Sequence, residues 1–236
     1  MGNIFKFLYP PRCPACRQVM EEDGTYIHPE CRGAFKTIGE PRCYKCGRRL
    51  WDPESDICSG CRQKKHSYGY GLALYEYNEV AQRAMLDYKS EGIRRNGDFF
   101  ASEAVNVLGR LIKRLDPEVL VPVPITDRKM RIRGFNQSEY LAEKIGGALN
   151  IPVDTDILFR TGEKAEQKKL SGRERLKIVS DSFTAVDDNP YKRICLVDDV
   201  YTTGSTMEGC TRALMSKGAK DVGFVVIFSV PENDTE

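Results

Sequence analysis

The chain has 236 residues, which is enough for one α/β domain and a small second module. Its 41% hydrophobic content is typical of a folded soluble protein, and a net charge of +2 does not by itself predict nucleic acid or a membrane as a partner. No segment approaches the roughly 18 consecutive apolar residues of a membrane-spanning helix. The apolar part of MGNIFKFLYPP is also too short for a signal peptide. We therefore expect a cytoplasmic protein that does not insert into membranes.

The first 66 residues differ in composition from the rest of the chain. They contain 12 Lys and Arg residues against 8 Asp and Glu residues, so the basic excess lies in this segment. Seven of the nine cysteines also precede residue 62. Because the cytosol keeps thiols reduced, these cysteines are predicted to be metal ligands rather than disulfide partners. Two domains are expected, at residues 1–66 and 67–236.

An internal repeat organises the cysteines. The hexapeptide PRCPAC at residues 11–16 recurs thirty residues later as PRCYKC, and the same shift aligns His28 and Cys31 with Cys58 and Cys61. The pattern C-x2-C-x11-[HC]-x2-C therefore occurs twice, with ligand pairs on tight turns that suit tetrahedral zinc. The predicted structural zinc ligands are Cys13, Cys16, His28 and Cys31 in the first lobe, and Cys43, Cys46, Cys58 and Cys61 in the second.

The first predicted site depends on His28, and two alternatives remain open if this residue is not a ligand. The first lobe would then be free of metal, or the two lobes would share one ion. A module of this size with little apolar content cannot form its own core, so the metal would supply its folding free energy. Cationic side chains lie among the aromatic residues Tyr44 and Trp51, which suits single-stranded nucleic acid or a surface that docks on another protein.

The second domain alternates predicted strands and helices. Strands are expected at residues 68–77, 118–125, 153–160, 193–199 and 221–230. Helices are expected at residues 78–92, 98–115, 136–150 and 205–219. Asn136, with Glu139 three residues later, is a predicted N-terminal cap, and Gly218 is a predicted helix stop. This alternation predicts a mostly parallel sheet flanked by helices, in which ligands bind at the carboxyl ends of strands.

The stretch ICLVDDVYTTGST, residues 194–206, lies at such a strand end. Ser205 and Glu208 form a predicted capping box, and the amides of residues 203–206 at a helix N-terminus suit a phosphate group. Asp198 and Asp199 are expected to face ligand hydroxyls or a hydrated cation, which indicates a ribose phosphate. The alternative interpretation of the acid pair is a solvated strand end. The sequence has no G-x-x-x-x-G-K-[ST] or G-x-G-x-x-G motif, which argues against a P-loop NTPase and a dinucleotide-binding fold.

These residues resemble the phosphoribosyl pyrophosphate (PRPP) motif of the type I phosphoribosyltransferases. The order of double zinc ribbon, VPVP, RIRGFNQSEYLA and PRPP motif resembles the ComF family of late-competence proteins across nearly the whole chain. The resemblance implies a type I phosphoribosyltransferase-like α/β fold, with the 5'-phosphate in the loop at residues 202–206 and the ribose on the acid pair. The implied PRPP contacts are Asp198, Asp199, Val200, Tyr201, Thr202, Thr203, Gly204, Ser205, Thr206, Val123, Pro124 and Lys89.

The same resemblance implies the remaining parts of the site. Residues 121–124 would be the pyrophosphate-binding loop, whose amides approach the diphosphate, and Arg131 and Arg133, followed by Asn136 and Gln137, would hold its charge. The residues implied in catalysis are Asp198, Asp199, Arg131 and Arg133. Mg2+ would bridge diphosphate and ribose oxygens. Residues 160–183 would be the catalytic loop, although a solvated linker is the alternative for that stretch.

Two functions follow from the resemblance. In the first, the protein binds PRPP and acts in uptake and processing of single-stranded transforming DNA, with a competence helicase or another DNA-uptake protein as a possible partner. In the second, it is an active phosphoribosyltransferase that transfers phosphoribose to an unidentified acceptor. No residue identifies an acceptor. A glutamine-dependent amidotransferase is not expected, because the sequence offers neither the separate glutaminase domain nor the nucleophilic N-terminal cysteine that such an enzyme needs. We favour the first function, because the family resemblance indicates the DNA-uptake pathway whereas nothing in the sequence indicates an acceptor.

Overall fold

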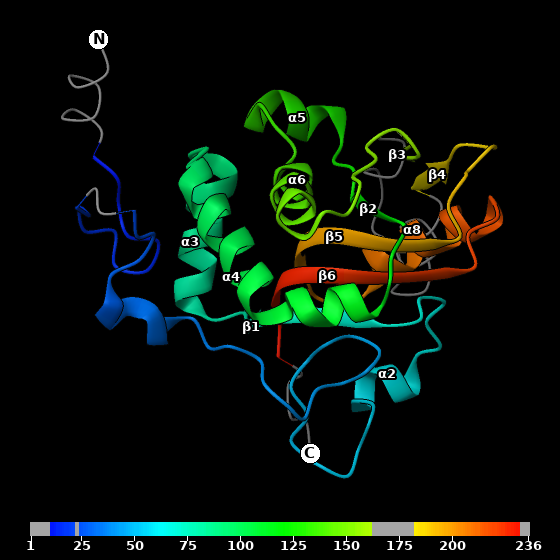
Figure 1. The fold of residues 1–236 in the computed structure, drawn as a ribbon, viewed down its shortest axis with the longest axis horizontal. Coiled ribbons are helices and arrows are strands. Elements are labelled where there is room, and N and C mark those ends of the chain that lie inside the picture. Colours follow the sequence, from blue (N-terminus) through cyan, green and yellow to red (C-terminus); the bar gives the residue numbers. More distant parts are fainter. Residues whose placement is uncertain (1–9, 22–23, 162–181, 232–236) are drawn as a thin grey trace, which may run out of the picture.

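The computed structural model describes residues 10–21, 24–161 and 182–231. Four parallel strands form its main sheet in the order β1, β6, β5 and β2 (Figure 1). These strands span Gly71–Glu76 (β1), Val119–Pro122 (β2), Arg193–Tyr201 (β5) and Asp221–Ser229 (β6). Their side chains are nearly all buried on both faces, as expected for a parallel sheet covered by helices. The predicted α/β class is confirmed.

Helices cover both faces of the sheet. One face packs against α3 (Glu79–Ser90), α4 (Arg94–Arg114) and α6 (Gln137–Leu149). The other face packs against α8 (Ser205–Ser216). A short helix, α5 (Asp127–Arg133), precedes α6 and was not expected from the sequence. None of the helices in the described part of the chain is long and apolar enough to cross a membrane.

The strand expected at residues 153–160 does not join the main sheet. Only β3 (Leu158–Arg160) forms, and it pairs antiparallel with β4 (Phe183–Ala185) in a separate two-stranded sheet. The chain touches the edge of β2 through a single bridge, between Leu120 and Val153. Asp154 then accepts a hydrogen bond from the amide of Asp156, which turns the chain away from the edge.

The predicted helix ends have mixed outcomes. Asn136 caps α6 by accepting a hydrogen bond from the amide of Ser138 at 3.1 Å, as predicted. Gly218, at φ +93°, follows the end of α8, also as predicted. The capping box at Ser205 is wrong. Gly204, at φ +79°, precedes the helix and makes no side-chain cap, and the carboxylate of Glu208 instead accepts hydrogen bonds from Ser67.

The N-terminal module packs on both faces of the sheet. It includes the 3-10 helix η1 (Pro29–Ala34) and the helix α2 (Ser59–Gln63). The first ribbon, residues 10–35, shares the core with α3 and α4, whereas the second ribbon, residues 39–65, shares the core with α8 (Figure 1). Between them, residues 36–38 pair with the open edge of β1, where the amide of Ile38 donates to Leu74 at 2.8 Å.

Phe35 shows how closely the module is joined to the larger domain. Its ring lies 5.5 Å from that of Tyr75 and 5.4 Å from that of Phe99, between ring centroids. It also contacts Phe100 and Phe228 at the centre of the core. We expected metal alone to supply the folding free energy of this module. Burial of its apolar residues against the α/β domain also contributes to that free energy.

Candidate ligand and metal sites

The acid pair, Asp198 and Asp199, lies within β5 as expected, and the strand continues two residues beyond it, to Tyr201. Both carboxylates have close donors. The hydroxyl of Ser138 in α6 donates to Asp198 at 2.7 Å, and the Lys89 ammonium in α3 contacts Asp199 at 2.8 Å. Burial, and then the negative charge of Asp199, raise the pKa of Asp198 to about 7. The two carboxylates therefore differ in their electrostatic surroundings, since only Asp199 has a cation as a direct partner among the described residues.

The loop at residues 202–206 joins the end of β5 to the N-terminus of α8. A Cβ atom at Gly204 would lie 2.5 Å from the Tyr201 hydroxyl and 2.8 Å from that of Tyr68. The positive φ of residue 204 and the lack of room for a Cβ atom therefore both require glycine. Thr203 is exposed, and its hydroxyl lies 2.9 Å from that of Ser205. The loop thus presents hydroxyls and amides at the positive end of a helix, a suitable arrangement for a phosphate group.

Residues 121–124 do not supply the amides that the resemblance implied. Pro122 and Pro124 have no N–H, and the amide of Val123 donates to the carbonyl of Val197 at 2.9 Å. Asn136 and Gln137 are buried, and Asn136 is engaged in capping α6 and in donating to Val123. These polar groups are therefore used within the fold and are not available to a ligand.

Cationic side chains from three elements gather near the acid pair. Arg133 in α5 is half-buried and donates to Gln137 at 2.8 Å, whereas Arg131 is exposed. Two further cations were missed from the sequence: Lys129 in α5 and Arg160 at the end of β3. Burial, followed by the positive charges of Arg160, Arg133 and Lys89, lowers the pKa of Lys129. Such mutual repulsion indicates a local excess of positive charge, which an anion would relieve.

The sequence contained a partial signal for these two residues. Lys129 lies in the same basic stretch as Arg131 and Arg133, but only the helical form of α5 shows which of its cations turns inward. Arg160 opens the stretch assigned to the catalytic loop. Residues 162–181 of that stretch lie outside the described part of the structure.

The eight predicted metal ligands form two separate groups. In each, the ligand atoms all lie within 4.8 Å of one another, and each group contains the residues of one repeat only. Tetrahedral zinc with Zn–S bonds of about 2.3 Å places its sulfur ligands about 3.8 Å apart. Cys46 and Cys58 have their Sγ atoms 3.6 Å apart, and Cys16 Sγ lies 3.4 Å from His28 Nδ1. Both groups fit structural zinc, and a single shared ion does not match this arrangement.

The repeat in sequence is also a repeat in structure. The amide of Cys13 donates to Gln18 at 2.9 Å, and the amide of Cys43 donates to Arg48 at 2.7 Å. Arg17 and Gly47 occupy the equivalent left-handed position after the two C-x2-C pairs, at φ +64° and +73°. Each of these two metal knuckles, at residues 13–18 and 43–48, is therefore closed by the same backbone hydrogen bonds.

Several of the basic side chains predicted to form a binding surface instead make contacts within the protein. Arg17 binds the buried carboxylate of Asp87, Arg42 donates to the carbonyl of Ile38, and Lys45 donates to the carbonyl of Tyr68. The two predicted aromatic residues remain accessible. Trp51 is 67% exposed and Tyr44 is 59% exposed.

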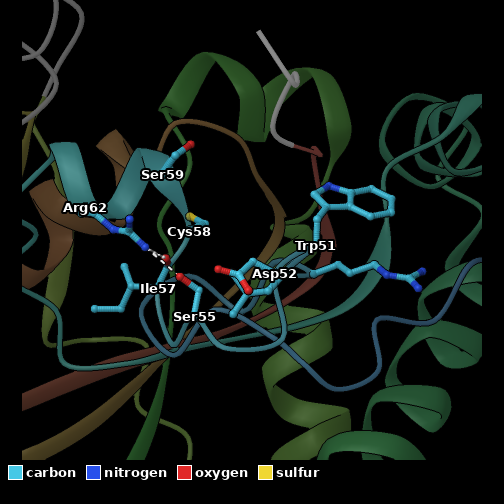
Figure 2. Close-up of a pocket in the computed structure, with 9 residues that line it drawn as sticks. Trp51, Asp52, Ser55, Ile57, Cys58, Ser59 and Arg62 are labelled. Carbon is cyan, nitrogen blue, oxygen red and sulfur yellow. Dashed lines mark hydrogen bonds between the residues drawn. The ribbon is translucent and has the colours of Figure 1, made fainter. Parts of the chain in front are cut away.

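Trp51 borders a hollow of about 260 Å³ in the second ribbon, which Figure 2 shows in close-up. The Arg49 guanidinium lies 5.2 Å from the centre of the Trp51 ring. On the other side of the hollow, Arg62 donates to the hydroxyl of Ser55 at 2.7 Å. This part of the surface combines an exposed ring with cations and hydroxyls.

Comparison with known proteins identifies two domains. Residues 4–63 match the double zinc ribbon domain, and residues 100–236 match the phosphoribosyl transferase domain. Competence protein F of Haemophilus influenzae is 28% identical over 228 residues, which cover 94% of this chain and 96% of that protein. Competence protein ComFC of Bacillus subtilis is 29% identical over 241 residues, with 92% of each chain covered.

DNA utilization protein YhgH of Escherichia coli K12 is 34% identical over 225 residues, which cover 90% of this chain and 94% of that protein. The chain therefore belongs to the ComF family, and it joins a double zinc ribbon to a phosphoribosyl transferase domain.

The two ligand groups predict about two zinc ions per chain, measured by elemental analysis of the purified protein. His28→Ala should lower the content to about one, because the first group loses its only nitrogen ligand whereas the second is unchanged. His66→Ala provides the matched control, since His66 is the other histidine of the chain and belongs to neither group. A zinc content that His28→Ala leaves unchanged would contradict the assignment of His28.

The raised pKa of Asp198 predicts a pH-dependent stability. The folded protein retains a proton that the unfolded chain releases near pH 4, so the unfolding free energy falls as the pH rises toward about 7. Asp198→Asn removes this cost. The stability of the variant relative to wild type should be greater at pH 8 than at pH 5, by on the order of 2 kcal/mol. Urea denaturation measures this difference, and Asp188→Asn, which replaces an exposed acid, is the control.

Proposed function

We propose that this member of the ComF family binds PRPP at the carboxyl end of β5 and acts on single-stranded DNA in the cytoplasm. One observation supports the ligand assignment: three different kinds of polar group lie at one end of the sheet. A hydroxyl-rich loop at a helix N-terminus, a pair of acids and a group of cations lie together there. PRPP has a phosphate, a ribose and a diphosphate, and each of these parts matches one of the three.

The 5'-phosphate and the ribose are assigned to β5 and the loop that follows it. The amides and hydroxyls of residues 202–206 suit a phosphate dianion, because they add donors to the positive end of α8. Asp198 and Asp199 suit ribose hydroxyls, since ionised carboxylates accept hydrogen bonds and repel phosphate. Carboxylate oxygens are also ligands that Mg2+ prefers, and this ion would neutralise part of the diphosphate charge.

The diphosphate is assigned to the cations that face the acid pair. Lys129 and Arg133 lie in α5 and Arg160 ends β3, and they are close enough for the charges of Arg160 and Arg133 to lower the pKa of Lys129. Arg131 is exposed at the same helix and is placed to extend this surface. A preorganised cationic group stabilises a diphosphate both as a ligand and as a leaving group. This second role supports an active phosphoribosyltransferase as the alternative function.

The proposed action on DNA rests on the relatives and on the second ribbon. Two of the relatives are named as competence proteins and one as a DNA utilization protein. The exposed rings of Trp51 and Tyr44 suit base stacking, and the exposed side chains of Arg49 and Lys64 suit phosphate contacts. Another DNA-uptake protein, such as a competence helicase, is a proposed partner at this surface.

Replacement of both acids by asparagine should abolish PRPP binding. The Asp198→Asn and Asp199→Asn double variant keeps the shape of the site but loses the ionised acceptors for the ribose hydroxyls. Titration calorimetry with PRPP and Mg2+ measures the affinity, and Asp188→Asn removes an exposed acid as the control. Undiminished affinity of the double variant would refute the ribose assignment.

Pyrophosphate measured in the same wild-type samples separates the two functions. Release that requires a particular acceptor would favour the transferase, whereas binding without release, with or without single-stranded DNA, would favour the binding role.

Single-stranded DNA should bind through the second ribbon. Trp51→Ala should lower the affinity for an oligothymidine by about tenfold, because stacking of a base on an aromatic ring contributes about 1–3 kcal/mol. The affinity of the wild type should also fall as salt is added, since phosphate contacts release counterions. Fluorescence anisotropy measures both effects. Phe159→Ala removes another exposed ring, 45% accessible in β3, and should leave the affinity unchanged. Equal losses for the two variants would count against the ribbon surface.

A further inference from the structure

The second metal knuckle, residues 43–48, reaches the loop at residues 202–206. Arg48 is the residue that closes this knuckle, and its guanidinium donates to the carbonyl of Thr202, the first residue of the loop. The same guanidinium lies 5.1 Å from the ring centre of Tyr201 and donates to the Ser229 hydroxyl at 3.3 Å. One side chain of the ribbon module therefore contacts the ends of two neighbouring strands, β5 and β6.

The backbone from which Arg48 extends is firmly seated on β1. A Cβ atom at Gly47 would lie 2.5 Å from the amide nitrogen of Ala73, so the knuckle and the strand are in direct backbone contact. The amide of Gly71 donates to the carbonyl of Tyr44 at 3.2 Å, and Lys45 donates to the carbonyl of Tyr68 at 2.8 Å. Arg48 thus approaches the loop from a fixed position.

The contact with Thr202 determines how the loop presents its next amide. A trans peptide is planar, and its C=O and N–H bonds point in opposite directions. Because the carbonyl of Thr202 is directed toward Arg48, the N–H of Thr203 is directed away from the ribbon. That amide belongs to the group assigned above to the phosphate. Gly204 is confined by the hydroxyls of Tyr201 and Tyr68, so the loop is restrained on both sides of Thr203.

We propose that Arg48 is a positioning residue for the 5'-phosphate of PRPP, through which the second ribbon holds the phosphate-binding loop in shape. This inference rests on the proposed PRPP function and goes beyond it, because it assigns the ribbon a role in ligand binding. The first ribbon does not duplicate this role. The residue equivalent to Arg48 in the first repeat is Gln18, and the interdomain arginine of that repeat, Arg17, binds Asp87 in α3.

Calorimetry on the full-length protein with three ligands tests this proposal. Arg48→Ala should weaken binding of PRPP and ribose 5-phosphate about tenfold, the usual scale for loss of one charged hydrogen bond. Binding of inorganic pyrophosphate should stay within about twofold of wild type, because the diphosphate is assigned to the cations of α5 and β3 and not to the loop that Arg48 holds. Arg62→Ala is the matched control. Arg62 also carries a guanidinium in the second ribbon, but it donates to Ser55 and Ile57 within that ribbon.

Further measurements keep the result interpretable. The melting temperature and zinc content of Arg48→Ala should match those of Arg62→Ala. If Arg48→Ala does not fold, Arg48→Gln, which carries the residue of the first repeat, should show the same selective loss. Unchanged affinity for ribose 5-phosphate would overturn the proposal, and so would equal losses for ribose 5-phosphate and pyrophosphate. Failure of the wild type to bind PRPP would instead overturn the proposed function, and this inference with it.

Discussion

The pairing of residues 36–38 with β1 is the interaction on which the rest of the structure depends. β1 is an edge strand of a small sheet, and an open edge leaves backbone N–H and C=O groups without partners. Residues 36–38 cover this edge, and Phe35 enters the aromatic core beside them. This short segment also sends one ribbon to each face of the sheet. The metal knuckles therefore rest on a domain that buries their apolar residues.

Local patterns in the sequence predicted features that depend on local chemistry. The cysteine repeat gave both ligand groups, because the tight turns that hold each C-x2-C pair are made by the residues between and after them. The four apolar strands of the main sheet and the Asn136 cap were also correctly predicted, whereas the strand expected at residues 153–160 forms only at Leu158–Arg160. The capping box at Ser205 failed for a long-range reason. Gly204 is confined by the hydroxyl of Tyr68, a residue far away in the chain, and Glu208 is drawn to Ser67.

The candidate site also contains some features that depend on local sequence and others that depend on long-range contacts. The acid pair and the loop after it form a continuous motif and could be recognised in the sequence. Lys129 and Arg160 lie in basic stretches of the sequence but could not be assigned to the site, because only the fold brings α5 and β3 together. The segment at residues 121–124 was misjudged because strand pairing with Val197 uses the amide of Val123. Backbone availability depends on the neighbouring strand, which a single stretch of sequence does not reveal.

The unequal surroundings of the two acids bear on how a ligand would be held. Lys89 compensates the charge of Asp199, whereas Asp198 receives neutral donors from Ser138 and from the adjacent backbone amide. Burial beside Asp199 makes the ionised form of Asp198 costly, which the raised pKa expresses. Ribose hydroxyls and a divalent cation would both favour that ionised form. Ligand binding at this site is therefore expected to be linked to loss of a proton from Asp198, and to strengthen as the pH rises through 7.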